Sequence, residues 1–115
     1  MWSYIASQDN KSGTPRYFTP EIIPNFKHTH KGTVSMAVAP ALEGNAGGCG
    51  SQFFITLTDN IDYLDGRHAV FGHVVEGLDT LDKLNDVFTD QDGRPLKDVR
   101  IRHVEILGRN FSSMY

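Results

Sequence analysis

The sequence is short of cysteine, of long apolar runs and of positive charge, and each shortage excludes a class of protein. Cys49 is the only cysteine in 115 residues, so an internal disulfide is excluded and a reducing compartment fits. No apolar run reaches the length of a membrane span, and the start of the chain does not have the pattern of a secretory signal. The formal net charge of −3 gives no general attraction to nucleic acid or to an anionic membrane. We therefore expect one intracellular globular domain without a membrane segment.

Few residues are candidates for nucleophilic or metal chemistry. Cys49 lies in the glycine-rich stretch GGCGS with no evident base beside it, which favours a free loop thiol over a nucleophile. His28 and His30 are two residues apart in KHTHK and would face one side of a strand. A metal site needs at least one more ligand, and no cysteine or acidic cluster near them supplies it. Ordinary loop histidines are favoured, and we expect no metal and no cofactor.

The hydrophobic pattern predicts a mainly β domain with one amphipathic helix. Leucines at 78, 81 and 84 fall on one face of a helix over 78–87, with charges opposite. Short apolar or alternating runs bounded by glycine or proline predict strands. The predicted strands are Gly32–Ala39, Gln52–Leu57, Ala69–Val74 and Val99–Leu107, with a short one at Trp2–Ile5. The segments without regular structure are a polar arm at 1–16, an extended proline-containing surface loop at 17–24, a loop at 40–50 and a loose tail at 108–115.

The stretch GSQFFITLTDNIDYLDGRHAVFG joins two of these strands through a polar connection that ends in the turn signal Asp65-Gly66. It combines an apolar set, Phe54, Leu64 and His68, with two polar groups, Gln52 and Arg67. A wall of this composition suits a small, flat apolar group beside a peptide backbone. Taken singly, the apolar members are more often core residues, and the histidine is more often a structural one.

Four motifs, in order and with approximately the family spacing, resemble the cyclophilin-type peptidyl-prolyl isomerases. They are GTVSMA (32–37), GSQFFIT (50–56), YLDGRHAVFG (63–72) and VEGLDTLDKL (75–84). The resemblance covers roughly residues 26–107, and we take residues 17–107 as the family-like part of the domain. GTVSM, the DYLDG variant and the ending DVRIRHVEIL are most similar to nuclear cyclophilins that carry a downstream RNA-recognition domain. No aromatic signature of that domain is found in this chain, so direct nucleic-acid binding is not expected.

The resemblance implies a closed eight-stranded antiparallel barrel capped by two helices, with the pocket on the outer surface. The family segment FHRxIxxFxxQGGD, which supplies an arginine of the catalytic site, is not found in residues 1–31. We therefore expect a single partial cyclophilin-like domain over 1–115, holding about four strands and one helix of the C-terminal part. The loop between SMA and GSQ is longer than usual, and Val38 stands where many members have asparagine.

The resemblance also assigns residues to a site. His68, Phe54 and Gln52 are the expected catalytic residues. The expected substrate-binding residues are Ala37, Val38, Gln52, Phe54, Tyr63, Leu64 and His68. Phe54, Leu64 and His68 would form the wall for the proline ring, and Gln52 would hold the substrate backbone.

The implied function is peptidyl-prolyl cis–trans isomerisation, which assists folding or conformational switching at Xaa-Pro bonds. The alternative is a catalytically impaired fragment that binds proline-containing peptides or acts as a scaffold, because the arginine-bearing segment is absent. Expected partners are proline-containing peptides or proteins, with cyclosporin-like ligands implied by the family. Exposed strand edges predict self-association. The subfamily resemblance places the protein in the nucleus, with the cytoplasm as the alternative.

Overall fold

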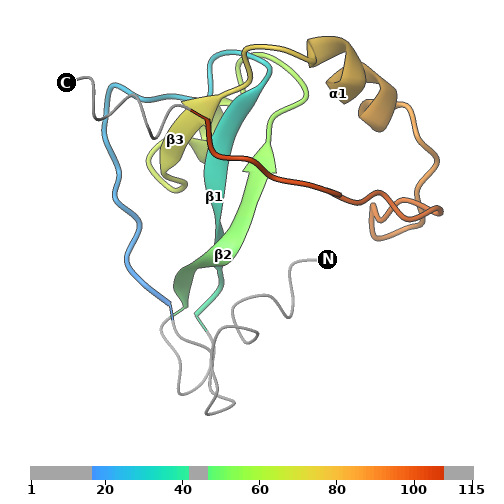
Figure 1. The fold of residues 1–115 in the computed structure, drawn as a ribbon. Coiled ribbons are helices and arrows are strands. Elements are labelled where there is room, and N and C mark those ends of the chain that lie inside the picture. Colours follow the sequence, from blue (N-terminus) through green and yellow to red (C-terminus); the bar gives the residue numbers. More distant parts are fainter. Residues whose placement is uncertain (1–16, 42–46, 108–115) are drawn as a thin grey trace.

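The computed structural model describes residues 17–41 and 47–107, so the predicted polar arm, the strand at Trp2–Ile5 and the tail lie outside the described residues. Within these ranges three strands form one antiparallel sheet with the order β2-β1-β3 (Figure 1). A short 3-10 turn and one α-helix complete the regular structure. The elements are β1 (Thr33–Ala39), β2 (Gly48–Ile55), η2 (Asp62–Leu64), β3 (Val70–His73) and α1 (Leu78–Asn85).

The central strand β1 sets the two faces of the sheet. Its register places Ser35 opposite Phe54 and Met36 opposite Phe53 of β2. Because consecutive strand residues point to opposite faces, the two phenylalanines lie on opposite sides of the sheet. Phe53 meets Phe71 of β3 edge to face, with ring centroids 6.3 Å apart. Phe54 therefore faces the other side, where the predicted site lies.

Strand β2 begins earlier than the sequence pattern indicates. The predicted loop over 40–50 is wrong for its last three residues, because Gly48 and Cys49 pair with Ala39 and Val38 across a bulge in β1. Cys49 also exchanges backbone hydrogen bonds with Phe18, at 2.8 and 2.9 Å. Cys49 is thus fully buried in a strand instead of lying in a loop. At the other end β2 stops at Ile55.

The prediction of a fourth strand at Val99–Leu107 is wrong. In Figure 1 these residues cross in front of the sheet, and they add no strand to it. A strand forms only when its N–H and C=O groups find a partner, and no residue within 17–41 or 47–107 pairs with this segment. The apolar side chains of the alternating pattern, such as Ile101 and Val104, are exposed. The described part of the chain is still mainly β with one helix, as predicted, and its three assigned strands form an open sheet.

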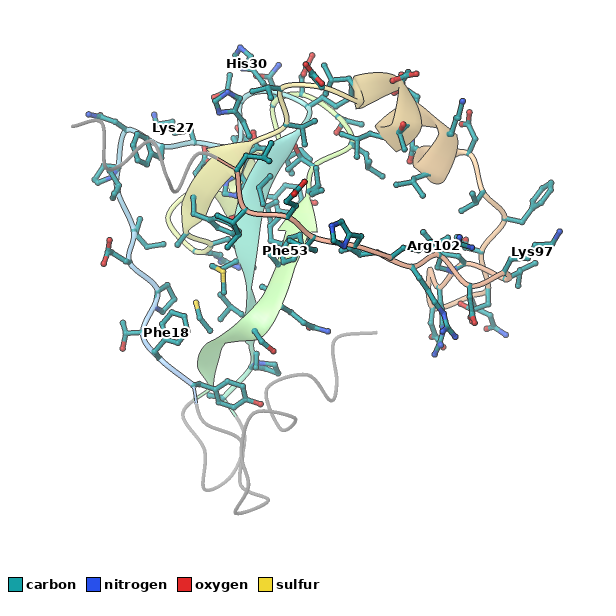
Figure 2. The ribbon with its side chains drawn as sticks, in the orientation of Figure 1. Phe18, Lys27, His30, Phe53, Lys97 and Arg102 are labelled. Atoms are coloured by element: carbon teal, nitrogen blue, oxygen red, sulfur yellow. The ribbon has the colours of Figure 1, made fainter. Side chains whose placement is uncertain are left out.

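Apolar burial is limited in the described part of the chain. Only Cys49, Ala69 and Leu81 are buried among its apolar residues, while Phe53 and Phe71 are 42% and 58% exposed. Figure 2 labels Phe53 on β2, where residues 99–107 cross the sheet in this view. The aromatic pair on this face is consequently only partly buried by the described residues.

Helix α1 begins at Leu78, as predicted, and ends two residues earlier than expected, at Asn85. Its predicted apolar face is buried only at Leu81. The helix is held near the start of β1 by an ion pair between Lys31 Nζ and Asp82 Oδ1 at 2.7 Å. Leu78 packs closely on Gly32, where an added Cβ would lie 3.0 Å from the leucine. Among the residues the structure describes, no helix is long and apolar enough to cross a membrane.

Candidate functional site

Phe54 and His68 come together on the side of the sheet opposite Phe53. Their ring centroids are 5.2 Å apart and their planes are nearly perpendicular, at 87°. Phe54 belongs to β2, and His68 follows the turn that η2 begins. In that turn the Leu64 carbonyl accepts the N–H groups of both Arg67 and His68 at 3.2 Å. The turn therefore returns the chain so that His68 meets the side chain of Phe54.

The imidazole of His68 is fixed by one further contact. Its Nδ1 lies 2.9 Å from the carbonyl oxygen of Met36 on β1. A carbonyl oxygen only accepts, so Nδ1 must donate, and Nε2 of the neutral ring is left as an acceptor. The ring is thus anchored to the sheet at one edge and packed against Phe54.

The other predicted site residues surround this pair to different degrees. Leu64 is half-buried in the turn, and Gln52 shares a face of β2 with Phe54. The Gln52 side chain makes no hydrogen bond to another described residue. Ala37 and Val38 are half-buried at the bulge of β1. Tyr63 is 74% exposed. The structure brings Phe54 and His68 into contact, and the roles assigned to all seven residues stay predictions.

His28 is the residue of this site that the sequence pattern did not reveal. The sequence predicts an ordinary loop histidine. His28 does lie outside the strands, but it is only 1% exposed, whereas His30 is exposed. Its ring is parallel to Phe54, with centroids 6.1 Å apart, and perpendicular to His68 at 6.4 Å. The burial of His28 was not predicted, because it depends on long-range contacts.

Two hydrogen-bonding groups hold the buried imidazole. Nδ1 lies 2.7 Å from Asp65 Oδ1, which also accepts the backbone N–H of His28 at 2.7 Å. Nε2 lies 2.9 Å from the hydroxyl of Ser35, which in turn donates to the carbonyl of Ala69 at 3.0 Å. The sequence pattern accounts for Asp65 by its turn alone. Its 37-residue separation from His28 leaves no local sequence signal for the contact.

The contacts with His28 change the titration of Asp65. The hydrogen bond from the backbone N–H of His28, followed by the one from its side chain, lowers the pKa of the carboxyl below its ordinary value of 3.8. The unfolded state therefore binds more protons near this pH. The resulting stabilisation is complete above the ordinary pKa and is lost as the pH falls through the lower folded value.

We predict that Asp65→Asn flattens the acid limb of the stability curve. Between about pH 5 and pH 3, the free energy of unfolding of the native chain should fall more steeply than that of the variant. The difference in slope corresponds to at most about one bound proton. Urea denaturation at several pH values measures both slopes, and equal slopes would contradict the prediction.

Other chemistry has little support among the described residues. Burial raises the pKa of the Cys49 thiol, which keeps it protonated and unreactive. No group of three or more potential metal ligands occurs in the ranges 17–41 and 47–107. A cavity of about 710 Å³ is lined by residues that include Phe26, Lys31 and Phe71, and it touches none of the predicted site residues. We place the site at the ring cluster, because the side-chain geometry there, and not this cavity, matches the predicted wall.

Comparison with known proteins identifies the fold family. A family model described as "Cyclophilin type peptidyl-prolyl cis-trans isomerase/CLD" matches residues 3–106. The chain belongs to the cyclophilin family. Curated cyclophilins similar to it include a peptidyl-prolyl cis-trans isomerase-like 4 from Cryptococcus neoformans, 73% identical over 91% of this chain and 20% of the relative. Another protein of that name, from Mycosarcoma maydis, is 52% identical over 97% of this chain and 23% of the relative.

Solved cyclophilin structures support the same placement. A Cryptosporidium parvum cyclophilin type peptidyl-prolyl cis-trans isomerase, crystallised in the presence of the dipeptide Ala-Pro, matches with a TM-score of 0.61 and 33% identity. The match covers 74% of this chain and 56% of that cyclophilin. The chain thus spans about a fifth of the curated relatives and somewhat over half of the solved structure.

Proposed function

We propose that this chain binds the proline ring of Xaa-Pro peptides at the Phe54–His68 pair and accelerates their cis–trans isomerisation. The observation that carries the proposal is the edge-to-face contact of these rings at 5.2 Å, with His68 anchored to the carbonyl of Met36. Membership of the cyclophilin family supports the reaction class. The presence of Ala-Pro in crystals of the Cryptosporidium relative supports the substrate class.

The chemistry requires positioning and not a covalent step. Rotation about the amide bond faces a barrier of about 18–20 kcal/mol, and uncatalysed Xaa-Pro exchange takes roughly tens to hundreds of seconds. A catalyst must hold the proline ring while it favours the twisted amide over the planar one. In this chain the wall of Phe54, Leu64 and His68 would hold the ring. The Gln52 amide, which bonds to no other described residue, would hold the substrate backbone.

Exchange spectroscopy by NMR on a short Ala-Pro peptide, with and without the 115-residue chain, tests the proposal. We expect measurable but weak acceleration. The sequence holds no FHRxIxxFxxQGGD segment, and the loss of one preorganised donor costs roughly a hundredfold in rate. If a folded sample gives no acceleration, the isomerase function is wrong for this chain. Chemical-shift titration with the same peptide then shows whether it only binds proline.

We further propose that copies of the chain associate through the partly exposed face and the edges of the sheet. No residue in the described ranges pairs with the outer edge of β3, and the face with Phe53 and Phe71 is exposed. Light scattering coupled to size exclusion should therefore give a mass above the 12.8 kDa of one chain, and the mass should rise with concentration. A monodisperse monomer up to the highest concentration would contradict this. Nuclear localisation and cyclosporin-like ligands stay predictions.

A further inference from the structure

Asp65, His28 and Ser35 are aligned as carboxylate, imidazole and hydroxyl, at 2.7 and 2.9 Å. This order and spacing match a hydrolytic triad. Burial excludes that role, because Ser35 is 0% exposed and its hydroxyl lies between His28 Nε2 and the carbonyl of Ala69. No substrate carbonyl can reach a hydroxyl in the middle of β1. The network must act on the protein itself.

His28 contacts both ends of the turn over residues 61–65, which carries Leu64 of the wall. Its N–H and Nδ1 both contact Asp65 Oδ1, at the end of η2, and its carbonyl accepts the N–H of Ile61 at 2.9 Å, at the start of η2. Three contacts from one residue therefore fix residues 61–65. Leu64 lies inside this segment, and its carbonyl accepts the N–H of His68.

The same imidazole supports both rings of the wall. It stacks parallel to Phe54, at 10° between the planes, and stands perpendicular to His68, at 88°. Both centroid separations fall within the range of favourable aromatic pairs, about 4.5–7 Å. A displacement of His28 would therefore remove a contact from Phe54 and from His68 at once.

The network is satisfied whichever protons the imidazole carries. With a neutral ring, Nδ1–H donates to Asp65 and Nε2 accepts from the Ser35 hydroxyl, while the Ala69 carbonyl keeps the N–H of Met36 at 2.9 Å. With a protonated ring, Nε2–H donates to Ser35, which donates to Ala69. Protonation of His28 therefore does not release it from the turn.

We propose that His28 and Asp65 form a brace: they are positioning residues that hold the rings of Phe54 and His68 in the geometry that binds proline. The proposal rests on the proposed function, since it explains how the proline-binding wall is kept in place. Neither residue needs to touch the substrate. The brace joins three segments distant in the sequence: the one before β1, strand β2 and the turn.

Asp65→Ala removes the carboxylate and should raise KM for an Ala-Pro peptide about fivefold to tenfold, with kcat changed by less than about twofold. The proline ring is bound alike before and during rotation, so a displaced wall weakens binding more than the chemical step. Asp65→Asn keeps an oxygen that can accept both His28 bonds and should restore KM to within about twofold.

His28→Asn tests the ring packing of the imidazole on Phe54 separately from its hydrogen bond to Asp65. The asparagine amide can still donate to Asp65 and hold the turn, but the ring behind Phe54 is gone. KM should rise as in Asp65→Ala. This variant decides the question if Asp65→Ala does not fold.

Asp59→Ala is the matched control. Asp59 Oδ1 accepts the N–H of Lys31 at 2.7 Å, which is the same type of bond between the same two parts of the chain, without contact to the rings. The aromatic NMR signals of Phe54 and His68, recorded without peptide, should shift in His28→Asn and Asp65→Ala and stay in place in Asp59→Ala.

Unchanged ring signals and unchanged KM in folded His28→Asn and Asp65→Ala, with a lower melting temperature alone, would overturn the brace. If the native chain fails to accelerate exchange, the proposed function fails. The peptide-free ring signals still decide the brace, so the two failures are distinguishable.

Discussion

Replacing Phe54 with alanine should lower kcat/KM for an Ala-Pro peptide by about 10- to 100-fold. The phenyl ring is the largest apolar surface of the predicted wall. It is half-buried in the free chain, and its full burial against a bound proline ring would contribute at most about 1.5–3 kcal/mol. The ring also packs edge to face on His68 at 5.2 Å, so its removal leaves the imidazole without this neighbour. NMR exchange spectroscopy on the peptide measures the effect.

Phe53→Ala is the matched control for this experiment. Phe53 is the adjacent residue of the same strand, but it faces the opposite side, where it contacts Phe71. It should lose a comparable aromatic contact and keep kcat/KM within about twofold, because the wall is untouched. Equal losses of activity in the two variants, with circular dichroism showing both folded, would contradict the placement of the site on the Phe54 face.

The second large effect is expected from Gly48→Ala, which should lower the free energy of unfolding by about 3–5 kcal/mol. Gly48 has a φ of +123°, and an added Cβ would lie 2.6 Å from the carbonyl oxygen of Phe18. The backbone strain costs about 1–3 kcal/mol. Moving Phe18 away also breaks its two hydrogen bonds with Cys49, each worth roughly 0.5–1.5 kcal/mol. Urea denaturation measures the change.

Gly66→Ala isolates the strain from the clash. Gly66 has a φ of +81°, but nothing lies within 4 Å of the position its Cβ would take. Its cost should be only about 1–2 kcal/mol, the penalty of a left-handed backbone for a residue with a Cβ. If both alanine variants lose the same stability, the close approach of Phe18 to the start of β2 does not contribute as proposed.

The elements that local sequence patterns encode were predicted correctly. The core of β1, the cores of β2 and β3 and the start of α1 follow from apolar runs, glycine boundaries and leucine spacing, all of which act within a few residues. The pairing of Gly48 and Cys49 could not be predicted, because it depends on a distant partner, Phe18, and glycine-rich stretches ordinarily indicate loops.

The segment Val99–Leu107 illustrates the converse error. Its alternation is the pattern of a half-buried strand, and the pattern alone cannot say whether a partner strand is present. In the described structure no partner is present, so the backbone forms no ladder and the apolar side chains are exposed. A strand is a property of two segments, whereas the pattern is a property of one.

By itself the sequence determined the family, the three strand cores, the helix start and the proximity of Phe54 to the turn that carries Leu64 and His68, because these are encoded in contiguous motifs. Only the tertiary structure decided that His28 is a buried part of the site. The contacts that bury it reach 37 residues along the chain to Asp65. Such a contact arises only when the segment before β1 packs against the turn, since burial and hydrogen-bond geometry depend on neighbours in space.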